Sequence, residues 1–220
     1  MVELTQDSHG SGMTSERTRL RMVERLREKG ITDERVLAVL AELPRHLFVD
    51  PALASRAYDD IALPIAYGQT ISQPYIVARM TELVVAKKPR KVLEIGTGCG
   101  YQTAVLAKLV PDIYSVERIG GLLDRARHNL RHVKLVHPRL SHVDGTTGLP
   151  ASGPFDAILV TAAAPYIPDA LVEQLAIGGR LIVPQGVQEQ YLWLIERTAT
   201  GRQDTRLEAV KFVPLLGGKI

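Results

Sequence analysis

VLEIGTGCG, residues 92–100, is the stretch that decides the fold of this chain. Its first four residues predict a buried strand that carries one carboxylate, and its glycines predict a turn that opens a helix. Glycine allows backbone N–H groups and a helix start to approach a nucleotide-like ligand closely. The alternative is a tight turn that binds nothing, because a glycine motif alone is weak evidence. The stretch therefore predicts an α/β domain and raises the question of its ligand.

The spacing of the glycines narrows the choice of ligand. A dinucleotide fingerprint reads G-x-G-x-x-G and points a helix N-terminus at a pyrophosphate. Here Gly96, Gly98 and Gly100 give the spacing G-x-G-x-G. Glu94 precedes them and would repel a phosphate, whereas it suits S-adenosylmethionine, which carries an ammonium and a sulfonium. The motif resembles the cofactor loop of class I methyltransferases.

Two further acids follow predicted strands. Residues 113–117 predict a strand ending in Glu117, about 20 residues after the first glycine, where a carboxylate can accept hydrogen bonds from ribose hydroxyls. A solvated acid at a strand end is the alternative. A short strand-like run ends near Val143 and is followed by Asp144 and Gly145. In class I methyltransferases an acid at that strand end faces the adenine amino group.

The later part of the chain predicts the second half of such a sheet. Residues 155–160, apolar except for Asp156, predict a fourth strand. The segment 175–184 predicts a helix, a stop at Gly178 and Gly179, and a fifth strand. This order resembles that of a methyltransferase sheet.

Composition is that of one soluble globular protein. A charged fraction of 23% and a hydrophobic fraction of 45% are ordinary, and no apolar run approaches the roughly 18 residues that span a membrane. One cysteine, Cys99, allows no internal disulfide and suits the cytoplasm. A net charge of +3 tolerates nucleic acid without requiring it. We expect residues 1–12 to be a disordered leader and residues 13–220 to be a single domain.

Two helices are predicted ahead of the glycine loop. Residues 14–29 form an arginine-rich helix, whose interleaved glutamates favour a solvated face over an RNA-binding face. Thr32 or Asp33 caps a second helix that runs through Leu43.

A second informative segment lies between these helices and the glycine loop. Residues 58–65 and 68–75 predict short extended pieces and a loop, and Pro74 suits the start of a helix. By local chemistry alone, Ser72 is best interpreted as a cap of that helix.

Several separated motifs, in this order, give the chain a close resemblance to the bacterial protein-L-isoaspartate (D-aspartate) O-methyltransferase family. The resemblance runs from about Thr14 to about Gly217, and it makes the Ser72 of TISQP a functional residue as well as a candidate cap. Cys99 departs from the family, which more often has serine there. The motifs are DDIALPI (59–65), GQTISQPYIVARM (68–80), VLEIGTGCGYQTA (92–104), SVERI (115–119), HVDG (142–145), FDAILVTAAAP (155–165) and VKFVPL (210–215).

The resemblance implies an activity and a fold. The reaction is methyl transfer from S-adenosylmethionine to the free α-carboxylate of L-isoaspartyl, and also D-aspartyl, residues in damaged proteins, which begins their repair. The fold is a doubly wound, Rossmann-like α/β sheet of about seven strands, with N-terminal helices (13–88) ahead of the core (89–220). A carboxylate is already ionised at neutral pH, so the reaction needs no general base, and we expect no metal.

The resemblance also implies roles for individual residues. Ser72 orients the substrate carboxylate, and the Val213 backbone holds the substrate main chain. The cofactor residues are Thr70, Ile71, Glu94, Gly96, Thr97, Gly98, Gly100, Glu117, Arg118, Asp144 and Gly145.

Three other functions are the alternatives to this one. An RNA methyltransferase is disfavoured because no Asn-Pro-Pro-Tyr-like motif occurs and Cys99 lies in the cofactor loop. A small-molecule methyltransferase is disfavoured by TISQP and VPL, and a non-catalytic binding module by the intact set of acids with Ser72. We expect a cytoplasmic monomer that acts on isoaspartyl proteins and peptides and binds neither nucleic acid nor membrane.

Overall fold

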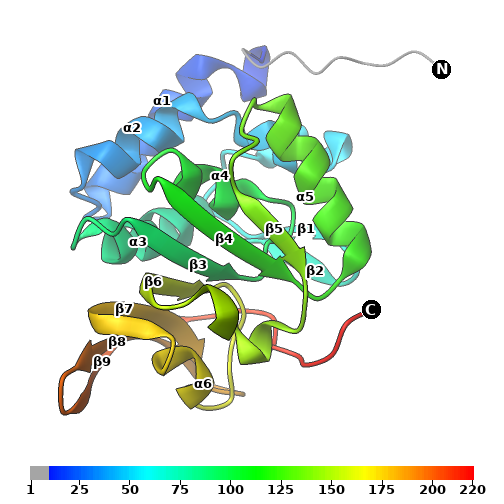
Figure 1. Cartoon of the computed structure of the whole chain (residues 1–220). Coiled ribbons are helices and arrows are strands. Elements are labelled where there is room, and N and C mark those ends of the chain that lie inside the picture. The colour runs from blue at the N-terminus through cyan, green and yellow to red at the C-terminus, as the bar shows by residue number, and fades with distance from the viewer. Residues whose placement is uncertain (1–9) are drawn as a thin grey trace.

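The computed structural model describes residues 10–220, which form a seven-stranded sheet with helices on both faces (Figure 1). Positions 1–9 of the predicted leader lie outside the described residues. Its last position, Gly12, is the first residue of the short 3-10 helix η1 (Gly12–Thr14). In strand order the sheet is β5 (Arg139–His142), β4 (Asp112–Glu117), β3 (Lys91–Ile95), β6 (Phe155–Val160), β7 (Leu175–Gln185), β8 (Gln190–Thr198) and β9 (Gly201–Val210).

The topology of the sheet places a ligand site at one edge. The strands from β5 to β7 are parallel, and β8 and β9 continue the sheet in antiparallel pairs. The chain leaves β3 toward β4 on one side and reaches β6 on the other. Open α/β sheets bind ligands beyond the carboxyl ends of the strands at such a switch point. The loop after β3 is the glycine motif, so the motif lies at this switch point.

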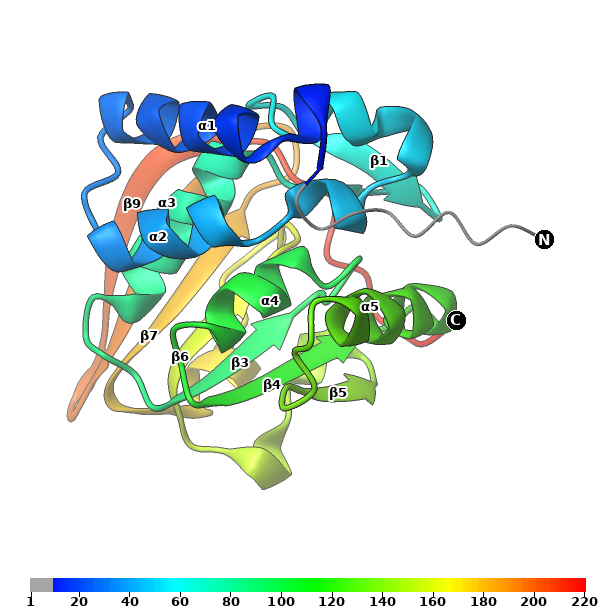
Figure 2. The same cartoon turned by 90° about the horizontal axis from the view of Figure 1, so that it is seen from above.

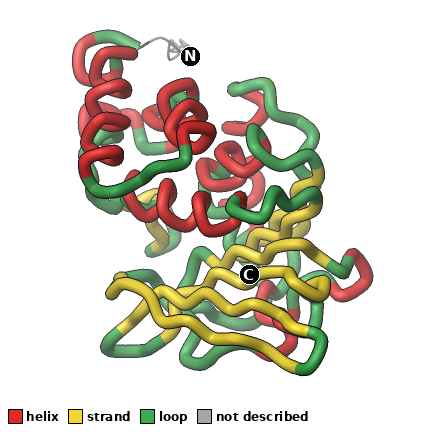
Figure 3. The backbone as a smooth tube through the Cα atoms, turned by 90° about the vertical axis from the view of Figure 1, so that its left-hand side faces the viewer, coloured by secondary structure: helices red, strands yellow, loops and turns green. Residues whose placement is uncertain are grey.

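Helices cover the sheet in unequal layers. Figures 1 and 2 show α3, α4 and α5 on one face, with α1 and α2 stacked outside α3 and α4, and α6 on the opposite face. The backbone tube shows the same asymmetry, with most helices gathered on one side of the strands (Figure 3). The helices are α1 (Glu16–Glu28), α2 (Glu34–Glu42), α3 (Pro74–Val85), α4 (Tyr101–Ala107), α5 (Gly120–His132) and α6 (Asp169–Val172).

Local chemistry explains where these helices begin. Asp33 caps α2 by accepting hydrogen bonds from the N–H groups of Arg35 and Val36, as the sequence predicts. Ser15 caps α1 in the same way. Pro74 occupies the first turn of α3, where its missing N–H costs nothing. Two 3-10 turns, η2 (Arg45–Phe48) and η3 (Pro51–Arg56), connect α2 to the segment ahead of α3.

The alternation of side chains along β3 decides which residues reach which face. Val92 belongs to the hydrophobic cluster under α1 to α5, whereas Leu93 and Ile95 belong to the cluster under α6. Because side chains alternate along a strand, Glu94 shares the face of Val92. The carboxylate of Glu94 therefore points toward the helices.

The segment before α3 contains a small hairpin that carries the TISQP motif. Strand β1 (Leu63–Ala66) pairs with β2 (Gln69–Ile71) in antiparallel fashion. Tyr67 and Gly68 form the turn, with φ values of 53° and 67°. This arrangement confirms the predicted short extended pieces and loop. Ile71 is buried and anchors the end of the hairpin in the core.

One predicted element is wrong. Residues 175–177 belong to β7, whereas the preceding helix α6 ends at Val172. Leu175 is fully buried opposite Phe155, and the next aligned pair is Ala157 with Arg180. Strand β7 therefore bulges here, and Gly178, with φ of 81°, permits the bulge. The two glycines interrupt a strand and do not end a helix.

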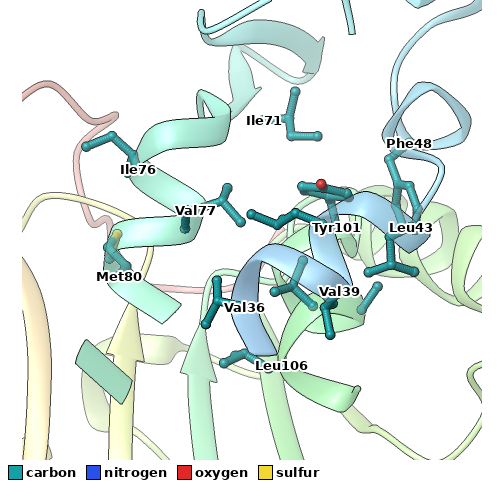
Figure 4. Close-up of a cluster of buried hydrophobic side chains, with 14 of the residues drawn as sticks. Val36, Val39, Leu43, Phe48, Ile71, Ile76, Val77, Met80, Tyr101 and Leu106 are labelled. Atoms are coloured by element: carbon teal, nitrogen blue, oxygen red, sulfur yellow. The ribbon is translucent and has the colours of Figure 1, made fainter. Parts of the chain in front are cut away.

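The N-terminal layer is fixed by apolar packing. Figure 4 shows Phe48 beside Tyr101, with Leu43 and Ile71 contributing to the same cluster. The rings of Phe48 and Tyr101 meet edge to face, with their centres 5.3 Å apart. This cluster joins η2 to the first residue of α4, immediately after the glycine loop. Among residues 10–220, no helix is both long and apolar enough to cross a membrane.

Candidate active site

A cavity opens at the carboxyl ends of β3, β4 and β6. Six segments distant in sequence contribute to its wall: the TISQP segment, the glycine loop, the end of β4 with the residues that follow it, and the segments after β5, β6 and β9. The predicted site residues that line it are Thr70, Ile71, Ser72, Gly96, Thr97, Gly98, Glu117, Arg118, Gly145 and Val213. The structure thus brings most of the predicted cofactor and substrate residues to one cavity, whereas Glu94, Gly100 and Asp144 do not line it.

The glycine loop requires glycine for both conformation and space. Gly96, Gly98 and Gly100 have φ values of 96°, 54° and 88°, in the left-handed region that side chains disfavour. A Cβ atom at Gly96 would lie 2.4 Å from Thr161 Oγ1. Gly100 ends the loop as the N-cap residue of α4. The loop therefore presents bare backbone to the cavity.

Glu117 fixes the glycine loop by accepting backbone hydrogen bonds. Its Oε2 accepts a hydrogen bond from Gly98 N at 2.9 Å, and its Oε1 accepts one from Ile119 N at 3.0 Å. The side chain is buried but reaches the cavity wall. Each carboxylate oxygen can accept a second hydrogen bond, so Glu117 retains capacity for hydroxyl donors of a ligand.

Glu94, a predicted cofactor residue, lies in the interior next to the glycine loop. Its carboxylate is fully buried and does not line the cavity. Thr103 and Ser115 each donate a hydroxyl hydrogen bond to Oε2 at 2.5 Å, and Oε1 has no partner in the described chain. Burial raises the pKa of Glu94 to about 8. The position of Glu94 follows from the alternation along β3, and its predicted role toward the methionine end of the cofactor stays a prediction.

Asp144 also lies off the cavity wall, although its neighbour Gly145 lines it. Asp144 Oδ1 accepts hydrogen bonds from the N–H and hydroxyl of Thr146 and so caps a 3-10 turn. Its Oδ2 accepts a hydrogen bond from Gly218 N at 2.6 Å. These bonds, that from Thr146 above all, lower the pKa of Asp144. The carboxylate thus anchors the segment after Val213 in this structure.

The Ser72 hydroxyl is available to a ligand. Gln73, not Ser72, is the N-cap residue of α3, and it caps with no side-chain hydrogen bond. The interpretation of Ser72 as the helix cap is therefore wrong. No described residue hydrogen-bonds the Ser72 hydroxyl, while the Ser72 carbonyl accepts a hydrogen bond from Arg45. A second cavity is also lined by Ser72 and Thr70. Ser72 therefore lies where two cavities meet.

Val213 lines the first cavity together with residues of the glycine loop. Its carbonyl accepts a hydrogen bond from Ala163 N at 2.8 Å, and the segment continues as a bridge between Ala163 and Pro214. This bridge holds the residues after β9 against the end of β6. The Val213 backbone is thus fixed beside the cavity that it lines.

Sequence reasoning missed Thr161 and Gln102, which also line the cavity. Thr161 Oγ1 donates to the carbonyls of Ile95 and Gly96 and so ties the end of β6 to the glycine loop. Its position directly after the predicted fourth strand was the signal that could have found it. Within the described ranges, no group of three or more His, Cys, Asp or Glu side chains is placed to hold a metal ion.

Solved structures place this fold and cavity in a class. A structure from Plasmodium falciparum, described as a protein-L-isoaspartate O-methyltransferase with bound S-adenosyl-L-homocysteine, superposes with a TM-score of 0.79 at 27% identity, over 90% of this chain and 98% of that chain. A second structure, described as a protein-L-isoaspartate O-methyltransferase, gives a TM-score of 0.80 at 28% identity, over 90% of this chain and 66% of the other. The fold and site are those of a class I, S-adenosylmethionine-dependent methyltransferase.

Sequence relatives narrow the class to a family. The family model for protein-L-isoaspartate(D-aspartate) O-methyltransferase matches residues 17–220. A protein-L-isoaspartate O-methyltransferase of Chromobacterium violaceum is 62% identical over 217 residues, covering 98% of each chain. One of Methylobacillus flagellatus is 62% identical over 214 residues, covering 95% of this chain and 96% of the relative. This chain belongs to the protein-L-isoaspartate (D-aspartate) O-methyltransferase family.

Proposed function

We propose that this chain methylates the α-carboxylate of L-isoaspartyl residues in damaged proteins, with S-adenosylmethionine as methyl donor, and that D-aspartyl residues are also accepted. The observation that carries the proposal is the position of Ser72, whose unbonded hydroxyl lies between the cavity of the glycine loop and a second cavity. A peptide in the second cavity would present its carboxylate to a methyl donor in the first.

The residues around the first cavity fit S-adenosylmethionine. Side chains at Gly96 or Gly145 would meet Thr161 or Ile95 within 2.5 Å, so these positions keep the backbone accessible. We assign the loop from Gly96 to Gly100, with Thr97, to the methionine end of the cofactor. Glu117 would accept hydrogen bonds from the ribose hydroxyls. The adenine end is assigned to Gly145, with Arg118 beside it and Asp144 in support.

Two assignments concern the cover and the charge of the site. Thr70 and Ile71, from β2, would close over the cofactor. Glu94 would act from beneath the loop through its charge, because its side chain does not reach the cavity wall. A carboxylate near a cation gains stability in its ionised form, so a cationic cofactor and Glu94 would favour one another.

The proposed chemistry needs few protein groups. S-adenosylmethionine supplies a methyl group on a positively charged sulfur. The substrate carboxylate is already ionised at neutral pH, so no residue has to remove a proton. Positive and negative charge disappear together in the transition state, which a partly dehydrated cavity favours. Ser72 donates a hydrogen bond that aligns the carboxylate, and the Val213 backbone holds the peptide main chain.

We further propose that residues 13–220 act as one unit, as a monomer in the cytoplasm. One hydrophobic cluster joins residues from Met22 to Leu192 and so links the N-terminal helices to the sheet. The single cysteine, Cys99, is consistent with a reducing compartment. The substrate partners are isoaspartyl-containing proteins and peptides.

Product analysis tests the proposal. The protein is incubated with an isoaspartyl peptide and methyl-labelled S-adenosylmethionine, and the position of the label is found by fragment mass spectrometry. We expect a methyl ester on the α-carboxylate of the isoaspartyl residue, released as methanol in mild base. Label elsewhere on the peptide, or no label although the cofactor binds, would contradict the proposal.

A further inference from the structure

Arg45 is a buried arginine that touches the segment carrying Ser72. Its side chain is fully buried, and the charge pairs among the described residues do not include it. Its Nη2 donates to the Ser72 carbonyl at 2.7 Å, and its Nε donates to the Ala57 carbonyl at 2.7 Å. A buried charge without an ionic partner is costly, so its presence here calls for a function beyond packing.

The same guanidinium also reaches the cofactor side of the site. Its central carbon lies 4.8 Å from the centre of the Tyr101 ring, within the range of a cation–π contact. Tyr101 is the first residue of α4, directly after Gly100, and it lines the first cavity. Phe48, also from η2, packs edge to face against the same Tyr101 ring (Figure 4). Arg45 thus touches both the substrate segment and the start of the helix after the cofactor loop.

We propose that Arg45 is a positioning residue, which sets the position of Ser72 relative to the glycine loop through its hydrogen bonds to two carbonyls and its contact with Tyr101. The inference rests on the proposed role of Ser72 in methyl transfer. Arg45 does not line either cavity and touches no substrate. Its effect is geometric, because the carbonyl that it holds belongs to the residue whose hydroxyl aligns the carboxylate.

Arginine suits this task better than lysine. The planar guanidinium presents donors in fixed directions and can bond two carbonyls at once, whereas an ammonium is a single point donor on a flexible chain. Arg45→Lys should keep the buried charge but lose one of the two carbonyl bonds. We therefore expect a shifted Ser72 in a folded protein.

The test compares Arg45→Lys with Arg19→Lys. Arg19 is also buried in the N-terminal layer and donates to a backbone carbonyl, that of Glu42, but it makes no hydrogen bond to the segment that carries Ser72. We expect Arg45→Lys to lower kcat on an isoaspartyl peptide at least about tenfold, since a small misplacement is costly in rate. The dissociation constant of Arg45→Lys for S-adenosyl-L-homocysteine should stay within about twofold of the wild-type value. Arg19→Lys should leave kcat unchanged.

Both variants are assayed at the same interval below their own melting temperatures. The inference would be overturned if kcat of Arg45→Lys stayed within about twofold of the wild-type value. It would also be overturned if Arg45→Lys and Arg19→Lys lost kcat equally. Arg45→Gln serves as a second variant if the lysine variant does not fold, because its amide donates to one carbonyl and buries no charge. Inactive wild-type protein would instead refute the proposed function.

Discussion

The backbone N–H of Gly98 donates a hydrogen bond of 2.9 Å to Oε2 of Glu117. The bond joins two features that lie apart in the sequence, the glycine loop after β3 and the acid that ends β4. Because the same carboxylate lines the cavity, Glu117 both shapes the loop and faces the ligand. Removal of the Glu117 carboxylate should therefore weaken cofactor binding both by loosening the loop and by deleting a contact with the ligand.

Glu117→Gln should weaken the binding of S-adenosylmethionine. The amide nitrogen cannot accept a hydrogen bond, and bonds to a charged group contribute about 1.5–3 kcal/mol, so we expect a loss of about 10- to 100-fold in affinity. Calorimetry measures the change. Asp156→Asn is the matched control, because Asp156 also accepts two backbone N–H bonds, from Arg90 and Lys91, but does not line the cavity. Unchanged affinity in Glu117→Gln would refute the ribose assignment.

Ser72→Ala should separate catalysis from cofactor binding. The substitution removes a hydroxyl that bonds to no described residue, so the fold and the affinity for S-adenosylmethionine should be preserved. The rate of methyl transfer should fall by about 10- to 100-fold, because the substrate carboxylate is no longer aligned. Steady-state kinetics and calorimetry together give both quantities. Ser15→Ala, at the cap of α1, is the control that lowers stability without altering the rate. Parallel losses of rate and cofactor affinity would make Ser72 a cofactor or folding residue instead.

Gly96→Ala should be far more damaging than Gly30→Ala. Both glycines have φ of 96°, so alanine pays a similar backbone cost of roughly 1–2 kcal/mol at each. A Cβ atom at Gly30 meets nothing within 4 Å, whereas one at Gly96 lies 2.4 Å from Thr161 Oγ1. We expect Gly30→Ala to lower only the melting temperature, and Gly96→Ala also to abolish measurable cofactor binding. Equal binding by the two variants would mean that the loop does not approach the ligand.

Glu94 should give the free protein a pH-dependent stability. Burial raises its pKa from 4.5 to about 8, so between these values the folded protein holds a proton that the unfolded chain has lost. Unfolding then releases a proton, and stability falls as the pH rises from about 4.5 to about 8. Glu94→Gln, which cannot ionise, should flatten this part of the curve of unfolding free energy against pH. Denaturant titrations of both proteins at several pH values measure it, and identical curves would show that Glu94 is ionised throughout.

The sequence predicted the sheet core well because buried parallel strands leave strong local signals. Phe155–Val160 is apolar at every position except Asp156 and forms β6 with the predicted bounds. The segment 175–177 was misassigned because its apolar residues suit a helix or a strand equally, and only the pairing of Leu175 with Phe155 decides between them.

The sequence predicted the membership of the site better than the direction of each side chain in it. Glu94 lies in the predicted motif, but its direction depends on which face of β3 the helices cover. Arg45 carries no motif of its own, and its role arises from contacts with Ala57 and Ser72 that only the folded chain brings together. Long-range contacts of this kind cannot be read from local pattern.

The central claim is that the chain recognises the isoaspartyl linkage itself. The most direct measurement is the initial rate of methyl transfer from labelled S-adenosylmethionine to two peptides that differ only in aspartate or L-isoaspartate at one position. We predict base-labile methylation of the isoaspartyl peptide alone. Equal methylation of both peptides, or of neither while the cofactor binds, would contradict the account.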